Sequence, residues 1–200
     1  MSYIIQVLTQ PLFFVVYKFL YKLEARGVEN VSEIQKPILI ISNHRSINDP
    51  WLIGASLPVF SNFFPLRYIG GTRFNPPLIW FYKIGIISFI YWLFGAFALS
   101  NEGTLEDKIQ PAIKLLKQGN AVIIFPEGGR KSRSGILGEF KKGAAEIFLK
   151  TGVPILPVSI KKLNEHSRVL CVTFGKSFVP VSNTAEGVTR ELYTKVVELL

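Results

Sequence analysis

The sequence predicts an α/β fold, in which a mostly parallel β-sheet has helices on both faces. Four short apolar runs alternate with longer segments of helical periodicity, and near-continuous apolar runs are typical of strands buried on both sides. The 200 residues are 48% hydrophobic, which suits one domain that buries its core without disulfides. The single cysteine, Cys171, excludes an internal disulfide and a cysteine-based metal cluster.

The first element is a nearly uncharged apolar segment, residues 3–20, with Lys18, Lys22 and Arg26 at its far edge. No basic residue precedes it and no small-residue cleavage site follows, so it does not resemble a secretory signal. Polar residues and Pro11 interrupt it, which favours a helix lying in or dipping into a membrane interface. A core helix packed on the domain is the alternative. We therefore divide the chain into an N-terminal apolar membrane-associating segment, residues 1–26, and a domain of residues 27–200.

The strands and helices of the domain follow from apolar runs, periodicity and glycine stops. The expected strands are residues 38–42, 121–125, 155–160 and 169–174. The expected helices are residues 51–56, part of 105–117, 139–150 and 185–200, with Gly119 and Gly152 as C-terminal stops. Pro111 leaves open whether the third of these segments becomes helical at residue 105 or at the proline.

A second long apolar stretch covers residues 77–99 and is interrupted only by Lys83. By length it could span a bilayer. Its β-branched residues, together with Gly85 and Gly95, favour instead a helix, a turn and a buried strand inside the domain. Its aromatic cluster suits either a contact at the level of lipid headgroups or core packing: Trp80, Phe81, Tyr82, Tyr91 and Trp92.

The charge balance favours anionic partners, because 23 Lys and Arg against 14 Asp and Glu give a formal net charge of +9. Phospholipid headgroups, phosphorylated cofactors and nucleic acid all fit that charge. Nucleic-acid binding would explain the charge but would not explain the apolar N-terminal segment. We therefore expect a membrane lipid and no nucleic acid as partner.

The most informative segment is residues 42–50, Ser-Asn-His-Arg-Ser-Ile-Asn-Asp-Pro, directly after an expected strand. On a regular helix, His44 and Asp49 would be turned ~140° from each other, so contact between them requires an irregular strand-to-helix turn. Pro50 disfavours helical geometry at Asp49 and suits the start of the next helix. A helix N-cap for Asp49 and a polar strand end for His44 are the structural alternatives.

A His and Asp pair can activate an alcohol, which is too weakly acidic to attack a thioester unaided. Histidine exchanges protons near neutral pH. A carboxylate on its other nitrogen fixes the tautomer and stabilises the imidazolium. If the substrate supplies the attacking hydroxyl, then no serine nucleophile is required and the acyl group passes directly from donor to acceptor.

A glycine-rich basic loop follows the strand at 121–125. Gly128 and Gly129 allow backbone N–H groups to approach an anion, and Arg130 can pair with phosphate oxygens. Lys141 and Lys142 stand at the start of the next helix, where they oppose its dipole and thus favour a binding role. A solvated surface turn is the alternative.

Together these segments resemble the glycerolipid acyltransferase family that includes the lysophosphatidic acid acyltransferases, over about residues 38–160. The family's first block, Asn-His with an Asp after four intervening residues, matches Asn43, His44 and Asp49. Its third block, Phe-Pro-Glu-Gly, matches residues 125–128, with the family arginine at Arg130. Its fourth block, apolar-Pro-apolar-apolar-Pro-Val, matches residues 153–158.

The resemblance implies transfer of a fatty acyl group from acyl coenzyme A or acyl carrier protein to the free hydroxyl of lysophosphatidic acid, giving phosphatidic acid. It implies His44 as the general base, Asp49 as its partner, and no metal or other cofactor. We expect the protein at the cytoplasmic face of a membrane. The expected substrate-binding residues are Glu127, Gly128, Gly129, Arg130, Lys141 and Lys142.

Two positions depart from the family pattern. Gly129 stands where family members usually carry Thr, and Ser100 stands where an arginine usually helps to hold the acceptor phosphate. Arg73, Lys141 or Lys142 could replace that arginine. Otherwise the acceptor is another lysophospholipid or membrane alcohol. A hypothesis of a different class is a non-catalytic membrane-binding protein, against which the intact His44 and Asp49 argue.

Overall fold

The computed structural model describes residues 2–32, 34–70, 78–98, 103–134, 136–162 and 169–200. Within these residues the centre of the fold is a seven-stranded sheet of order β1-β7-β6-β2-β5-β3-β4. All neighbouring strands pair in parallel except β6 and β7, which confirms the predicted, mostly parallel sheet. The strands are β1 Glu24–Arg26, β2 Ile38–Ser42, β3 Leu66–Gly70, β4 Ala96–Ala98, β5 Ala121–Ile124, β6 Ile155–Lys162 and β7 Leu170–Phe174.

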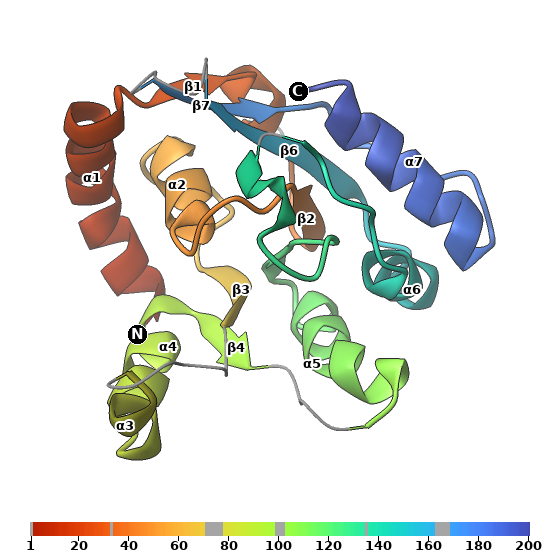
Figure 1. The fold of residues 1–200 in the computed structure, drawn as a ribbon, viewed down its shortest axis with the longest axis horizontal. Helices are drawn as coiled ribbons and strands as arrows, with labels where there is room; N and C mark the ends of the chain where they lie inside the picture. Colours follow the sequence, from red (N-terminus) through yellow and green to blue (C-terminus); the bar gives the residue numbers. More distant parts are fainter. Residues whose placement is uncertain (1, 33, 71–77, 99–102, 135, 163–168) are drawn as a thin grey trace.

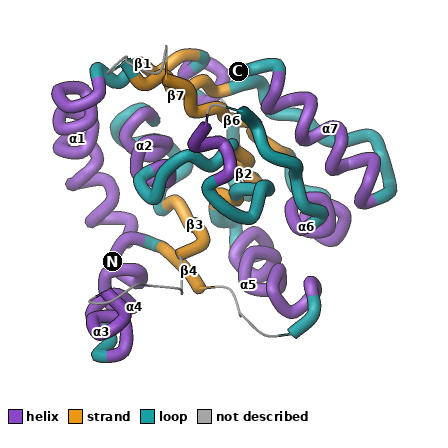
Figure 2. Tube along the Cα trace, viewed as in Figure 1, coloured by secondary structure: helices purple, strands orange, loops and turns teal. Residues whose placement is uncertain are grey.

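Helices cover both faces of the sheet (Figures 1 and 2). The helices α1 and α2 lie on one side, and α5, α6 and α7 lie on the other (Figure 1). The α-helices are α1 Ser2–Tyr21, α2 Asp49–Ser56, α3 Leu78–Lys83, α4 Ile86–Phe94, α5 Leu105–Lys117, α6 Gly143–Thr151 and α7 Ala185–Val197, and the 3-10 helices are Val28–Val31 and Lys131–Ser134.

The apolar side chains of β2 contribute to two hydrophobic cores, one on each face of the sheet. Ile38 and Ile40 pack in the cluster beneath α1 and α2, whereas Leu39 and Ile41 pack beneath α5, α6 and α7. Successive side chains of a strand point to opposite faces, and all four of these are completely buried. This two-sided burial explains why the sequence shows a continuous apolar run at this strand.

Residues 77–99 contain two helices rather than one. Over its described part this stretch forms α3, a turn at Gly85, α4 and the short strand β4. Gly85 has a φ of 84°, in the left-handed region that glycine adopts without strain. The expected helix and turn are present, with the second helix in addition, and the strand is present but half-buried at Ala96 and Phe97 rather than buried.

The helix α5 begins at Leu105 and not at Pro111. Thr104 accepts a hydrogen bond from the backbone N–H of Asp107, and the Asp107 carboxylate accepts one from the backbone N–H of Thr104. This capping box satisfies N–H groups at the helix start, so Pro111 is accommodated inside the helix.

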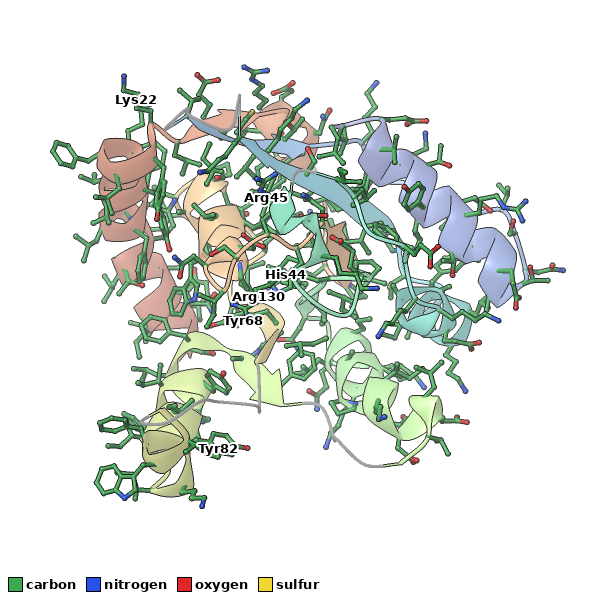
Figure 3. All side chains as sticks on the ribbon, viewed as in Figure 1. Lys22, His44, Arg45, Tyr68, Tyr82 and Arg130 are labelled. Carbon is green, nitrogen blue, oxygen red and sulfur yellow. The ribbon has the colours of Figure 1, made fainter. Side chains whose placement is uncertain are left out.

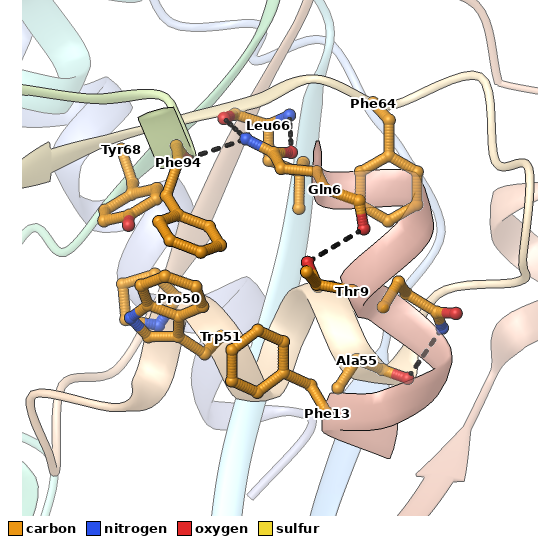
Figure 4. Close-up of a pocket in the computed structure, with 12 residues that line it drawn as sticks. Gln6, Thr9, Phe13, Pro50, Trp51, Ala55, Phe64, Leu66, Tyr68 and Phe94 are labelled. Carbon is orange, nitrogen blue, oxygen red and sulfur yellow. Dashed lines mark hydrogen bonds between the residues drawn. The ribbon is translucent and has the colours of Figure 1, made fainter. Parts of the chain in front are cut away.

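The apolar helix α1 is fastened to the domain by buried glutamines (Figure 4). Gln6 Nε2 donates to the carbonyl oxygens of Leu66 and Phe94, and Gln6 Oε1 accepts from the backbone N–H of Leu66. Gln10 Nε2 donates to the carbonyl oxygens of Ala55 and Leu57. A small cavity of about 40 Å³ remains between α1, α2 and β3. The polar residues that interrupt the apolar segment therefore face the domain.

Among the described residues, α1 is the one helix long and apolar enough to cross a membrane, as judged by length and composition alone. Immediately after it, β1 pairs in parallel with β7, so residues 24–26 belong to the sheet. The division of the chain at residue 26 concerns function and stays a prediction.

Candidate active site

His44 and Asp49 meet through the irregular turn that their spacing requires. The strand β2 ends at Ser42 and α2 begins at Asp49, so both residues flank a short non-helical connection. His44 Nδ1 lies 2.8 Å from Asp49 Oδ2. The histidine side chain is 19% exposed and the aspartate side chain only 1%. A buried carboxylate thus holds a partly exposed imidazole.

The hydrogen bonds of Asp49 assign the tautomer of His44. Asp49 Oδ2 also accepts from the backbone N–H groups of Arg45, at 2.6 Å, and Ser46, at 2.8 Å. An oxygen that already accepts from two N–H groups carries no proton, so His44 Nδ1 must be the donor in the third contact. In the neutral ring, Nε2 then has a free lone pair and can act as a base.

These contacts also weigh against helix capping as the role of Asp49. A capping side chain accepts from N–H groups of the helix that follows it, whereas the N–H groups bound by Asp49 Oδ2 precede it in the chain. The second carboxylate oxygen, Oδ1, is buried and has no hydrogen-bond partner in the described part of the chain.

The glycine-rich loop reaches the same edge of the sheet because β2 and β5 are parallel neighbours. Phe125, directly after β5, stacks on the imidazole of His44 with ring centroids 4.2 Å apart and an interplanar angle of 18°. The ring is thereby held from one side by Phe125 and at Nδ1 by Asp49.

Glu127 lies beneath this site, with its side chain completely buried. Glu127 Oε1 accepts from the backbone N–H of His44 and from the hydroxyl of Ser132, both at 2.7 Å. Glu127 Oε2 accepts from the backbone N–H of Gly138 at 2.9 Å. Both carboxylate oxygens are therefore occupied by the protein, and Glu127 links the loop to the backbone of His44. Its predicted part in acceptor binding stays a prediction.

The remaining predicted binding residues divide into two groups. Gly128, with a φ of 65°, lies against the side chain of Lys141, and the Lys141 backbone N–H donates to the Pro126 carbonyl oxygen. Lys142 instead forms an exposed ion pair with Glu186 at the start of α7. Lys141 is thus part of the loop structure, while Lys142 is engaged elsewhere. Binding of substrate by either lysine stays a prediction.

A basic cleft of about 490 Å³ adjoins the turn that carries Asp49. Its cations are Arg45, Arg130 and Lys162, none of which forms an ion pair with another described residue. Figure 3 shows Arg45, Arg130 and His44 together near the centre of the molecule. Against these three cations, Asp49 is the one acidic residue among the described residues that line the cleft, and this excess of positive charge favours an anionic ligand. Arg73 and Ser100 lie outside the described residues.

Two tyrosines near the site remain protonated at neutral pH. Burial raises the pKa of Tyr17 to about 12, and the neighbouring Tyr21 and the negative charge of Asp49 add to the effect. Burial also raises the pKa of Tyr68, with smaller effects of Tyr91 and Tyr17. Neither hydroxyl can serve as a base under these conditions.

Sequence reasoning assigned no role to four residues that shape the site. Asn43 bridges β2 to β6, because its side chain donates to the Ile160 carbonyl and accepts from the Ile160 N–H. Ser132 binds Glu127, and Arg45 and Lys162 line the basic cleft. The Asn-His pair was a signal for Asn43. Ser132 and Lys162 have no signature in the sequence.

Fold and site together define the class of protein: an α/β protein with a hydrogen-bonded His–Asp pair and a glycine-rich basic loop at one edge of a mostly parallel sheet. The chain belongs to the Acyltransferase family, whose model matches residues 22–161. It is 32% identical over 147 residues, 72% of its length, to a chloroplastic 1-acyl-sn-glycerol-3-phosphate acyltransferase from Arabidopsis thaliana. It is 28% identical over 164 residues, 74% of its length, to a probable 1-acyl-sn-glycerol-3-phosphate acyltransferase from Mycoplasma genitalium.

The fold is also that of a solved structure, the 1-acyl-sn-glycerophosphate acyltransferase PlsC from Thermotoga maritima. The TM-score is 0.70 at 21% identity, covering 96% of this chain and 77% of the other. The match covers only 37% of the Arabidopsis protein and 59% of the Mycoplasma protein. The chain therefore spans little more than a third of the length of the Arabidopsis protein and about three fifths of the length of the Mycoplasma protein.

Substitution by threonine should affect the stability of the protein differently at Gly128 and at Gly129. A Cβ atom at Gly129 meets nothing within 4 Å, whereas at Gly128 it lies 2.9 Å from the side chain of Lys141 and on a backbone of positive φ. We expect Gly129→Thr to change the free energy of unfolding by less than about 0.5 kcal/mol. Gly128→Thr should cost about 1–2 kcal/mol or more. Thermal unfolding of both variants checks this, and equal losses would contradict it.

Proposed function

We propose that the chain transfers a fatty acyl group from a thioester donor to the free hydroxyl of lysophosphatidic acid, giving phosphatidic acid. The observation that carries the proposal is the fixed tautomer of His44, whose Nδ1 donates to a carboxylate held by two backbone N–H groups. A base at this position suits attack by an alcohol. The names of the relatives support the choice of acceptor.

In the proposed reaction, His44 Nε2 takes the proton of the acceptor hydroxyl. At the same time the oxygen of that hydroxyl attacks the carbonyl carbon of the thioester. The carbon–sulfur bond breaks, and the leaving thiolate takes the proton back from the imidazolium. Asp49 stabilises the imidazolium between these steps. The products are an ester and a thiol, and no acyl-enzyme forms.

The proposed donors are acyl coenzyme A or acyl carrier protein. Both are anionic, which fits a chain of net charge +9. The proposed steps use no metal and no cofactor beyond this co-substrate, and they involve no nucleic acid.

The basic cleft supports a phosphorylated acceptor. We assign the acceptor phosphate to Arg130 together with Arg45 and Lys162, which line the cleft beside Asp49. Family members usually carry an arginine at the position that Ser100 occupies in this sequence. The three cations of the cleft would take over the role of that arginine. Arginine suits a phosphate because its planar group donates two parallel hydrogen bonds.

We expect Lys162→Ala to raise the KM for lysophosphatidic acid about ten-fold, since a hydrogen bond to a charged group contributes roughly 1.5–3 kcal/mol. The KM for a neutral lysolipid should not change. Steady-state kinetics with both acceptors measure the difference. Lys176→Ala, which removes an exposed lysine from a different cleft, is the matched control. A rise in KM for both acceptors, or for neither, would contradict the assignment.

The arrangement of α1 supports membrane association. Its buried residues are Ser2, Gln6, Gln10 and Tyr17, whereas its outward face is apolar and exposed. This helix is fastened through Gln6 and Gln10 to α2, β3 and α4. A spanning orientation would draw those elements into the bilayer. We therefore place α1 in the plane of the cytoplasmic membrane surface, with its outward face in the lipid.

The experiment that tests the proposal is thiol release from acyl coenzyme A by the purified protein. Lysophosphatidic acid and lysophospholipids with larger headgroups are supplied in turn. Release that is largest with lysophosphatidic acid is expected. Release only with another acceptor would favour a different lysophospholipid or membrane alcohol as substrate. No release with either class of donor would favour a non-catalytic membrane-binding protein.

A further inference from the structure

The helices α3 and α4 form a hairpin, residues 78–94, whose apolar side chains are largely exposed in the part of the chain that the structure describes. No residue of α4 is buried. Phe89 is 60% exposed, Trp80 59% and Trp92 54%. Isolated apolar residues are normal on a protein surface, whereas a contiguous apolar patch marks a site of interaction. The exposed hairpin therefore indicates a site of interaction.

The charge around the hairpin indicates an anionic lipid surface as the partner at this site. Neither residues 2–22 nor residues 78–94 contain an Asp or a Glu. The cations of these segments, Lys18, Lys22 and Lys83, are all exposed. Basic residues near a membrane are attracted to anionic headgroups. Tryptophan and tyrosine, both present in the hairpin, concentrate at the membrane–water interface.

The hairpin is also continuous with the outward face of α1. Gln6 of α1 donates a hydrogen bond to the carbonyl oxygen of Phe94, the last residue of α4. Phe94 packs against Phe13 of α1, with ring centroids 6.4 Å apart. Figure 1 shows the hairpin projecting from the end of α1, on the side of the molecule away from α6 and α7. The two elements can therefore meet the same leaflet.

We propose that the α3–α4 hairpin is a second membrane-docking element, which inserts its aromatic side chains into an anionic leaflet beside the outward face of α1. The inference extends the membrane association proposed for α1, and it does not depend on acyl transfer. Docking through two separate elements fixes the orientation of the domain as well as its distance from the bilayer, which a single helix does not achieve.

The first test compares vesicle binding of two variants in which glutamate replaces exposed apolar residues at different places. Phe89→Glu and Trp92→Glu, combined in one protein, replace exposed aromatics of the hairpin by charges. Val181→Glu makes the same kind of change at a residue that is 92% exposed and lies before α7. Vesicles of phosphatidylcholine, with and without phosphatidylglycerol, are sedimented with each protein and with wild type.

The hairpin variant should bind phosphatidylglycerol vesicles at least about ten-fold more weakly than wild type, since burial of one aromatic side chain contributes roughly 1.5–3 kcal/mol. Val181→Glu should bind like wild type. Wild-type affinity in the hairpin variant would overturn the proposal. A hairpin that pairs with a second copy of the chain would instead give a wild-type dimer that the variant loses, with lipid binding unchanged, and this too would overturn it.

The second test needs no added charge. Lipids brominated on their acyl chains quench tryptophans that enter the bilayer, and this chain has three: Trp51, Trp80 and Trp92. Trp51 is packed within the protein against Phe13 and Phe94. Quenching should be strong in wild type and should largely disappear when Trp80→Phe and Trp92→Phe are combined. Undiminished quenching in that variant would place the hairpin outside the lipid.

The two proposals fail in different ways. A wild-type protein that binds vesicles but releases no thiol with a water-soluble short-chain acceptor contradicts the proposed function and leaves the docking result intact. Conversely, a hairpin variant that turns over the soluble acceptor normally and still binds vesicles like wild type contradicts the docking proposal alone.

Discussion

His44→Ala should lower the rate of thiol release by about 10²–10⁴-fold, the range typical of a lost general base. The reason lies in the geometry of the pair: His44 Nδ1 donates to Asp49 Oδ2 at 2.8 Å, so Nε2 is the ring nitrogen with a lone pair for the acceptor hydroxyl. Without the ring the base is lost, and the nearby Tyr17 cannot replace it, because burial raises its pKa to about 12. Steady-state kinetics of the purified variant measure the loss.

The matched control is His166→Ala, which removes the other histidine of the chain and should leave turnover intact. Vesicle binding and thermal unfolding of His44→Ala should remain close to wild type, since the ring is partly exposed. Added imidazole should restore part of the activity by occupying the space beside Phe125. Turnover of His44→Ala within a few-fold of wild type would remove this residue from the mechanism.

The parts of the fold that could be predicted are those in which local sequence and burial agree. The strand β2 lies between two helical layers, so every position is buried, the first four are apolar and the run is visible in the sequence. The strand β3 was missed because its burial alternates and Arg67 interrupts the pattern. The strand β1 was missed because its three residues, Glu-Ala-Arg, carry no apolar signal, and only pairing with β7 makes them a strand.

The site was predictable where chemistry depends on side chains and unpredictable where it depends on backbone groups. The spacing of His44 and Asp49, with Pro50 after them, correctly indicated an irregular turn that joins the two. By contrast, the donors that surround Glu127 are mainly the backbone N–H groups of His44 and Gly138, 83 residues before it and 11 residues after it. Backbone N–H groups have no residue signature, so the sequence alone could not indicate a buried, fully bonded Glu127.

This arrangement gives the second large prediction, which concerns Glu127→Gln. The glutamine keeps the shape of the side chain but replaces one accepting oxygen by an NH₂ donor. In one orientation this donor faces the N–H of Gly138, and in the other it faces the N–H of His44. Either way a buried N–H group loses its acceptor, which costs roughly 1–3 kcal/mol. The resulting displacement of His44 should lower kcat by up to about 10²-fold, while the KM for lysophosphatidic acid stays within a few-fold of wild type.

The division between kcat and KM separates a positioning residue from a binding one. If the Glu127 carboxylate contacted the acceptor directly, Glu127→Gln would chiefly raise the KM and leave thermal unfolding unchanged. If it positions the backbone of His44, kcat and the unfolding temperature fall together. Glu139→Gln makes the same chemical change at an exposed residue next to Gly138, and it should alter neither quantity. An unchanged kcat in Glu127→Gln would mean that His44 keeps its place without this carboxylate, supported by Asp49 and Phe125 alone.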